Sequence, residues 1–96
     1  MTEEKRLERE LVKRVEDNKI GGRCVKFIPD ILKGFPDRIC LFPGARVVFV
    51  EVKDPAKSPT PMQRYWIRIL RKLDFPVYVL DKDETIELIL DHANPR

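Results

Sequence analysis

The chain has 96 residues, of which 43% are hydrophobic and 36% are charged, and its formal net charge is +3. This length can bury one hydrophobic core, so we expect a single domain over residues 1–96. The mild basic surplus is compatible with a polyanionic partner but does not require one. No apolar run is long enough to span a membrane, so we expect no membrane partner and an intracellular, cytoplasmic protein, either bacterial or viral within a host cell.

The chain begins with a predicted amphipathic helix over residues 3–18. Its apolar positions recur at helical spacing among charged neighbours, and they are Leu7, Leu11, Val12 and Val15. Gly21-Gly22 ends this helix, and residues 23–27 have the composition of a short strand. Residues 28–33 are open between a loop and a helical turn, because Pro29-Asp30 can begin either.

The middle of the chain predicts a hairpin. Residues 37–42 and 45–53 have the composition of strands, and Pro43-Gly44 between them favours a tight turn. Residues 47–50 form a continuous β-branched and aromatic run, which is typical of a central strand covered on both faces. Cys24 and Cys40 lack zinc-ligand spacing and are expected to be buried, reduced thiols.

A second helix is predicted over residues 61–73. It begins with a capping box that contains Thr60 and Gln63, with Pro61 at the first helical position. The apolar stripe expected to face the sheet consists of Met62, Tyr65, Trp66, Ile69, Leu70 and Leu73. We interpret its aromatic residues as core rather than as platforms for stacking nucleic-acid bases.

The last predicted elements are a buried strand over residues 77–80 and a short helix. Asp81 or Asp83 is expected to cap this helix, which continues to about Leu90, and residues 94–96 are expected to fray. The order is α-β-β-β-α-β followed by a terminal helix. It indicates the α/β class, with a mixed sheet flanked by helices.

Two motifs carry residues that can do chemistry, namely Gly34-Phe35-Pro36-Asp37 and Glu51-Val52-Lys53. Because side chains alternate along a strand, Glu51 and Lys53 share one face. Asp37 and Glu51 could then offer oxygen ligands to a magnesium-like ion, with the lysine amine beside the water or phosphate that the ion polarises. This combination predicts hydrolysis of a phosphodiester.

Each of these residues also has a simpler interpretation. Asp37 after a proline is, taken alone, more often a turn or cap residue, and Glu51 with Lys53 would also fit an exposed strand end. Gln63 could simply complete the capping box. Their combination with an acidic residue on an apolar helical stripe favours a functional site, because unpaired charge near a core is costly.

The ordered set resembles the PD-(D/E)xK nuclease superfamily and, within it, the stand-alone virus-type replication-repair nuclease (VRR-Nuc) domains. The resemblance covers nearly the whole chain, from a glutamate in the first helix, through the two motifs, to Gln63 ahead of Trp66. It implies a restriction-endonuclease-like fold and a DNA endonuclease that depends on Mg²⁺ or Mn²⁺.

The resemblance also implies roles for individual residues. Asp37 and Glu51 correspond to the acidic metal ligands, and the backbone carbonyl of Val52 corresponds to a further ligand. Lys53 corresponds to the residue that orients the attacking water and offsets charge on the scissile phosphate. Gln63 matches the family's glutamine, with the expected task of positioning Lys53 or the water.

The acid of the first helix has several candidates. At about 100° per residue, Glu8 falls inside the apolar stripe whereas Glu10 points away, so Glu8 is the predicted metal ligand. Residues 8–12 are also similar to the start of archaeal Holliday-junction resolvases, in which the first glutamate of this stretch belongs to the active site. Glu4, one turn earlier, remains an alternative.

The expected function is therefore metal-dependent hydrolysis of DNA in replication, repair or recombination. Similar stand-alone members look like resolvases, so we expect structure-selective cleavage of branched DNA, such as a Holliday junction, by a homodimer. Two alternatives remain. One is a catalytically inactive nucleic-acid-binding or scaffold module with the same fold, and the other is a nuclease that acts in restriction or in degrading ends.

Overall fold

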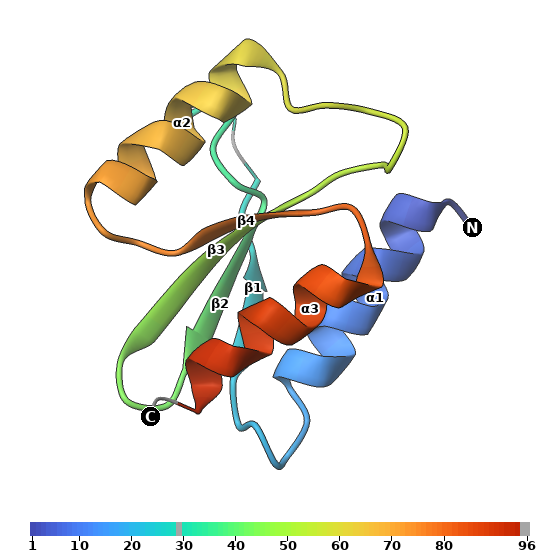
Figure 1. Ribbon diagram of the computed structural model, residues 1–96, viewed down its shortest axis with the longest axis vertical. Coiled ribbons are helices and arrows are strands. Elements are labelled where there is room, and N and C mark those ends of the chain that lie inside the picture. Colours follow the sequence, from blue (N-terminus) through green and yellow to red (C-terminus); the bar gives the residue numbers. More distant parts are fainter. Residues whose placement is uncertain (29, 95–96) are drawn as a thin grey trace.

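A computed structural model describes residues 1–28 and 30–94, with the elements in the order shown in Figure 1. Pro29, which belongs to a predicted turn, and residues 95–96, which belong to the predicted frayed end, lie outside the described residues. The helices and strands of the described part are α1 (Glu3–Val15), β1 (Arg23–Lys26), β2 (Arg38–Phe42), β3 (Arg46–Val52), α2 (Pro61–Lys72), β4 (Val77–Leu80), α3 (Asp83–Leu90) and the 3₁₀ helix η1 (Asp91–Ala93).

The four strands of the described part form one mixed sheet in the order β1-β2-β3-β4. β1, β2 and β3 are antiparallel neighbours, whereas β4 runs parallel to β3 after the crossover through α2. The predicted hairpin is confirmed, with Phe42 opposite Arg46 across a turn in which Gly44 has a left-handed φ of 82°. As predicted, β3 is a central strand, and it is buried along most of its length.

Helices cover both faces of this sheet (Figure 1). α1 and α3 lie side by side over one face, and α2 lies over the other. The larger core forms under α1 and α3, and its fully buried members include Leu7, Leu11, Val15, Cys40, Val48, Val50, Leu80, Ile86 and Ile89. The smaller core forms under α2 from Phe49, Ile67, Leu70 and Val77.

The stripe predicted for α2 is rotated relative to the one observed. Met62, Tyr65 and Leu73 are exposed, and Ile67, which the prediction omitted, is buried with Leu70. The inward positions are therefore 63, 66, 67 and 70, at the 3–4 spacing of a single helix face. The sheet decides this phase, because Ile67 and Leu70 pack against Phe49 and Val77.

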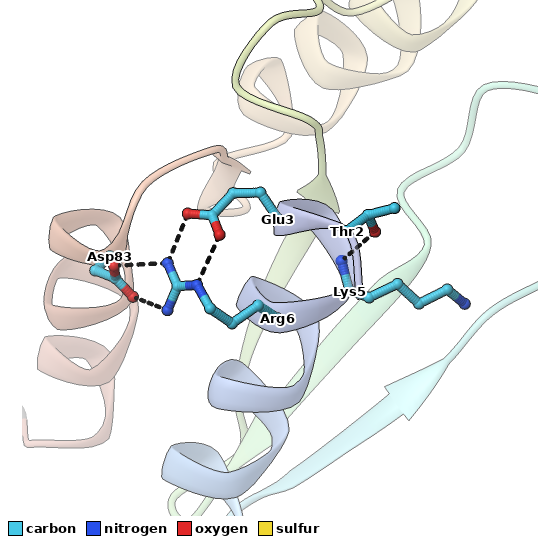
Figure 2. A network of polar contacts seen from close by, with 5 residues as sticks. All are labelled: Thr2, Glu3, Lys5, Arg6 and Asp83. Carbon is cyan, nitrogen blue, oxygen red and sulfur yellow. Dashed lines mark hydrogen bonds and ion pairs between the residues drawn. The ribbon is translucent and has the colours of Figure 1, made fainter.

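Two predicted helix ends are wrong. α1 ends at Val15 rather than at residue 18, since the Asp17 carboxylate accepts the Lys19 N–H in a local turn that competes with the helix. Neither predicted aspartate caps α3, whose N-cap is Lys82 without a side-chain hydrogen bond. The carboxylate of Asp83 instead binds Arg6 of α1, as Figure 2 shows.

The segment left open between loop and helix is a loop. Its described residues form bends and a turn, and Ile31 is almost fully exposed. Cys24 and Cys40 lie directly opposite each other on β1 and β2 as buried free thiols, as predicted. Within residues 1–28 and 30–94, no helix combines the length and apolar character needed to cross a bilayer.

Candidate active site

The candidate site forms where β2 begins, β3 ends and α2 begins. Because β2 and β3 are antiparallel, with Arg38 opposite Val50, Asp37 lies beside the end of β3. The Asp37 carboxylate accepts a hydrogen bond from the Val52 N–H, with an N to Oδ1 distance of 3.0 Å. The two motifs singled out from the sequence therefore meet at one edge of the sheet.

Gln63 connects the other two predicted site residues. Its Nε2 donates to Glu51 Oε2 at 2.8 Å, and its Oε1 accepts from Lys53 Nζ at 2.9 Å. The same Oε1 accepts from the Thr60 N–H at 2.8 Å, while Thr60 Oγ1 accepts from the Gln63 N–H at 3.2 Å. The predicted capping box is thus present, and it holds the Gln63 amide between a carboxylate and an ammonium group.

A glycine lets the segment before Asp37 approach the start of α2. Gly34 has a φ of 84°, and a Cβ added to it would lie 2.6 Å from the Met62 carbonyl carbon. L side chains rarely adopt this backbone conformation, and the gap leaves no room for one. Phe35 then packs its ring edge-on against Trp66, with centroids 5.3 Å apart. Gly34 and Phe35 thereby fix the position from which Asp37 reaches β3.

The two acidic residues of the site are electrostatically costly. Glu51 is only 5% exposed. Burial and repulsion from Asp37 raise the pKa of its carboxyl to about 8, although the charge of Lys53 acts in the opposite direction. Burial also raises the pKa of Asp37, despite the hydrogen bond from Val52. Among the described residues, no lysine or arginine forms an ion pair with either carboxylate.

Glu8, the predicted ligand from the first helix, is engaged elsewhere. Its Oε2 lies 2.9 Å from Arg38 Nε and 3.6 Å from Lys26 Nζ. Glu8 contributes to the raised pKa of Asp37, so it lies near the site, but it is not among the groups that raise the pKa of Glu51. Glu8 as a metal ligand stays a prediction, and it would require the carboxylate to exchange at least one of these cations.

Glu4, the alternative from the first helix, has a different environment. Its charge contributes to the raised pKa of both Asp37 and Glu51, and no ion pair engages it within the described ranges. In the described part of the chain, no group of three or more His, Cys, Asp or Glu side chains is gathered closely enough to hold an ion. The site therefore contains two carboxylates, those of Asp37 and Glu51. A glutamate of α1 would have to move closer to them to act as a third ligand.

The chemistry of this donor set fits a hard divalent cation. The buried Glu51 and partly buried Asp37 carboxylates both have raised pKa values, and neither has an ion-pair partner among the described residues. They offer oxygen ligands, which Mg²⁺ and Mn²⁺ prefer. Positive charge between them would relieve their repulsion. The residues at this sheet edge therefore fit the divalent cation that the sequence motifs imply.

The sequence analysis missed the role of Arg38. Arg38 alternates along β2 with Cys40 and Phe42, both buried toward α1 and α3, so it lies on an otherwise apolar strand face. A basic residue on such a face needs a carboxylate partner. That alternation was the available signal, and Glu8 is the partner that the fold supplies.

Three comparisons relate this chain to known proteins. A family model described as VRR-NUC domain matches residues 1–83. A protein named "Putative nuclease p44", from Acyrthosiphon pisum secondary endosymbiont phage 1, is 36% identical over 83 residues, which cover 86% of this chain and 87% of that protein. A solved structure described as "VRR_NUC domain" aligns with a TM-score of 0.83 and 28% sequence identity, over 96% of this chain and 98% of that chain.

Proposed function

The chain belongs to the VRR-NUC domain family, as its motifs predicted, and on this premise we propose that it is a divalent-metal-dependent DNA endonuclease. The predicted α/β fold, with a mixed sheet flanked by helices, is confirmed by the structural match. The family and the phage relative support a nuclease function, which implies a nucleic-acid substrate. The observation that carries the finer proposal is the Gln63 amide between Glu51 and Lys53, next to Asp37.

In this proposal, Asp37 and Glu51 hold Mg²⁺ or Mn²⁺, with the Val52 carbonyl and a glutamate of α1 completing the ligand set. When bound, such an ion lowers the pKa of a coordinated water and offsets negative charge on the phosphate. The burial of Glu51 and its repulsion from Asp37 support this assignment, because both effects favour cation binding. Glu8 and Glu4 remain the two candidates for the α1 position.

Lys53 supplies a compact positive charge at the reacting centre. Its Nζ, held by Gln63 Oε1, can orient the attacking water and stabilise charge that develops on the phosphate. Gln63 is a positioning residue in this scheme. By donating to Glu51 Oε2 and accepting from Lys53, it stands between the two charges and leaves the other Glu51 oxygen available as a ligand.

The proposal is tested by cleavage of end-labelled DNA in Mg²⁺, Mn²⁺ and EDTA. Cleavage should require one of the metals, and Asp37→Asn and Lys53→Ala should each lower the rate by about a hundredfold or more. The amide oxygen introduced by Asp37→Asn would still accept from the Val52 N–H, so folding should persist. Lys72→Ala, at the far end of α2, is the matched control for the lysine. Retention of most activity in either site variant would overturn the proposal.

We also propose that the substrate is branched DNA and that the enzyme acts as a homodimer. Support comes from exposed apolar side chains, because exposed apolar surface is typical of an interface. They belong to β1, β2 and the loop after β1, and they are Val25, Ile28, Ile31, Leu32 and Leu41. A two-fold axis through such a surface would place two sites on opposed strands.

Sedimentation and substrate profiling test this second part. Val25→Lys should shift a dimer to a monomer and reduce paired incision of a four-way junction, with Leu88→Lys on the exposed side of α3 as the control. A protein that is monomeric in solution and prefers linear duplex would contradict it.

A further inference from the structure

The basic residues of α1 fall into two groups with different surroundings. Arg6 binds Asp83 of α3 at 2.8 Å, and Arg14 binds Glu87 of α3 at 2.6 Å. Figure 2 shows Arg6 reaching toward α3, with Lys5 directed to the opposite side of α1. The arginines at positions 6 and 14 thus hold the two helices together, and their charges are offset by carboxylates.

The second group is a basic stripe that consists of Lys5, Arg9 and Lys13. All three side chains are exposed, and no ion pair engages them within the part of the chain that the structure describes. Their four-residue spacing puts them on one face of the helix, about 6 Å apart along its axis. Among residues 1–28 and 30–94, these three cations therefore lie in a row without an ion-pair partner.

The basic stripe forms one wall of a groove of about 490 Å³ between α1 and the first two strands. The opposite wall carries Lys26 and Arg38, which are paired across β1 and β2. With the stripe, they give the groove five cationic side chains, against the single carboxylate of Glu8. This local surplus of four charges exceeds the net charge of +3 of the whole chain. The basic character of the protein is therefore concentrated here.

Glu8 does not make the groove repulsive to anions. Its carboxylate is neutralised by Arg38 at 2.9 Å and Lys26 at 3.6 Å, and its side chain is only 13% exposed. The groove ends near the candidate site, because Arg38 of its lining directly follows Asp37 and Glu8 is close enough to act on the Asp37 charge.

We propose that this groove binds the phosphodiester backbone of the nucleic-acid substrate beside the scissile phosphate, and that it does so without the metal. The basic stripe spans about 12 Å, which corresponds to three to four phosphate-to-phosphate steps of one strand at about 3.4 Å per step. Lysine and arginine on phosphates fix the position of a strand without reading its sequence. The location beside the scissile phosphate rests on the proposed function, but binding to the groove does not.

The test compares two triple variants in an Asp37→Asn background, so that neither metal nor cleavage enters the measurement. Lys5→Gln/Arg9→Gln/Lys13→Gln removes the basic stripe. Lys19→Gln/Arg46→Gln/Lys72→Gln removes two lysines and one arginine at other accessible positions, so its net charge is the same. Glutamine preserves helix propensity, and circular dichroism checks the fold of both variants.

Affinity is measured in EDTA by anisotropy of a fluorescein-labelled four-way junction and a linear duplex at increasing salt. Loss of the basic stripe should weaken binding at low salt by at least tenfold. It should also make the negative slope of log K against log salt shallower by between two and three, at about 0.9 for each lost phosphate contact. The control triple should keep the slope of its parent. Equal weakening in both triples would show a general charge effect and overturn the proposal, as would unchanged binding in the stripe variant or no binding by the parent.

This outcome is separable from that of the proposed function. If the unmodified protein cleaves no DNA and the stripe variant still loses binding, the groove is supported and the nuclease proposal fails. If cleavage occurs and the stripe variant binds like its parent, the groove proposal alone is wrong. Binding of an acidic protein segment with no binding of DNA would also contradict the groove proposal.

Discussion

Glu51 gives the site a measurable dependence on pH. Its pKa is raised from an ordinary value of 4.5 to about 8, so the folded state binds the proton more tightly than the unfolded state. The stabilising contribution is therefore complete below about pH 4.5 and is lost as the pH rises through about 8. Without metal, the free energy of unfolding should fall across this window by up to about 1.4 kcal/mol per unit between the two pKa values.

Urea unfolding in EDTA at several pH values measures this loss. Glu51→Gln, which keeps the side-chain size and a hydrogen-bond partner for Gln63, should flatten the pH profile. Identical profiles for the variant and the parent would show that Glu51 is not the group responsible.

Asp37 should show opposed effects on stability and activity. Asp37→Asn removes the charge that repels Glu51 yet keeps an oxygen for the Val52 N–H, so the metal-free protein should melt at a higher temperature. Cleavage by the same variant should be lost. Differential scanning calorimetry in EDTA measures the first effect, and a decrease in melting temperature would contradict the repulsion inferred between the two carboxylates.

Gln63 has a role in the helix cap and a role in the site, and two substitutions separate them. Glutamate also completes a capping box, so Gln63→Glu should leave α2 stable while it places a third carboxylate against Glu51. Gln63→Ala removes both roles. Both variants should lose about 10- to 100-fold in activity, as is typical when a group that orients metal ligands is removed. Full activity in Gln63→Glu would show that its amide does not position the site.

At the scale of elements, the contact between the loop before β2 and the start of α2 decides the geometry of the site. Gly34→Ala forces an alanine into a left-handed φ and also places its Cβ 2.6 Å from the Met62 backbone. The loop and α2 must then move apart. Gly21→Ala is the matched control, because Gly21 has a φ of 74° but its nearest new contact is 3.7 Å. The control should lose only about 1 kcal/mol of unfolding free energy.

Gly34→Ala should lose more stability than Gly21→Ala and should also lose most cleavage activity, since Asp37 and Gln63 would separate. Chemical denaturation and the cleavage assay measure both effects. Equal costs for the two glycines would mean that the approach of the loop to α2 is not tight.

The elements also show how far the sequence determines the fold. The capping box of Thr60 and Gln63 was predictable because both partners lie within one helical turn. The stripe of α2 was not, because Tyr65 and Ile67 are both apolar and only the sheet selects Ile67. Likewise, no local signal shows that Asp83 binds Arg6, 77 residues away, rather than capping its own helix. The capping box was thus predicted from local sequence, whereas tertiary partner choice was not.

The same distinction applies to the candidate site. Motif spacing and strand alternation predicted that Asp37, Glu51 and Lys53 converge, and the family resemblance added Gln63 at the start of the helix. The contacts of these residues agree with that placement. The state of Glu8 was not predictable, because it depends on Arg38 from another element.

At the scale of the whole molecule, charge is distributed unevenly around the sheet. The buried carboxylates lie at one sheet edge, and the groove along α1 beside them carries a surplus of positive charge. Such a field attracts a polyanion and weakens with salt. Raising the salt concentration should therefore raise the KM for DNA cleavage much more than it lowers kcat, and steady-state kinetics in Mn²⁺ measures this. A salt effect confined to kcat would contradict the inferred charge-driven binding.

The central claim is that Asp37 and Glu51 together bind a divalent cation, and titration with Mn²⁺ followed by electron paramagnetic resonance tests it without any substrate. The parent should bind Mn²⁺ saturably, and Asp37→Asn and Glu51→Gln should each weaken binding by about tenfold or more. Glu10→Gln, on the side of α1 next to α3, should bind like the parent. Unchanged Mn²⁺ affinity in both site variants would contradict the account.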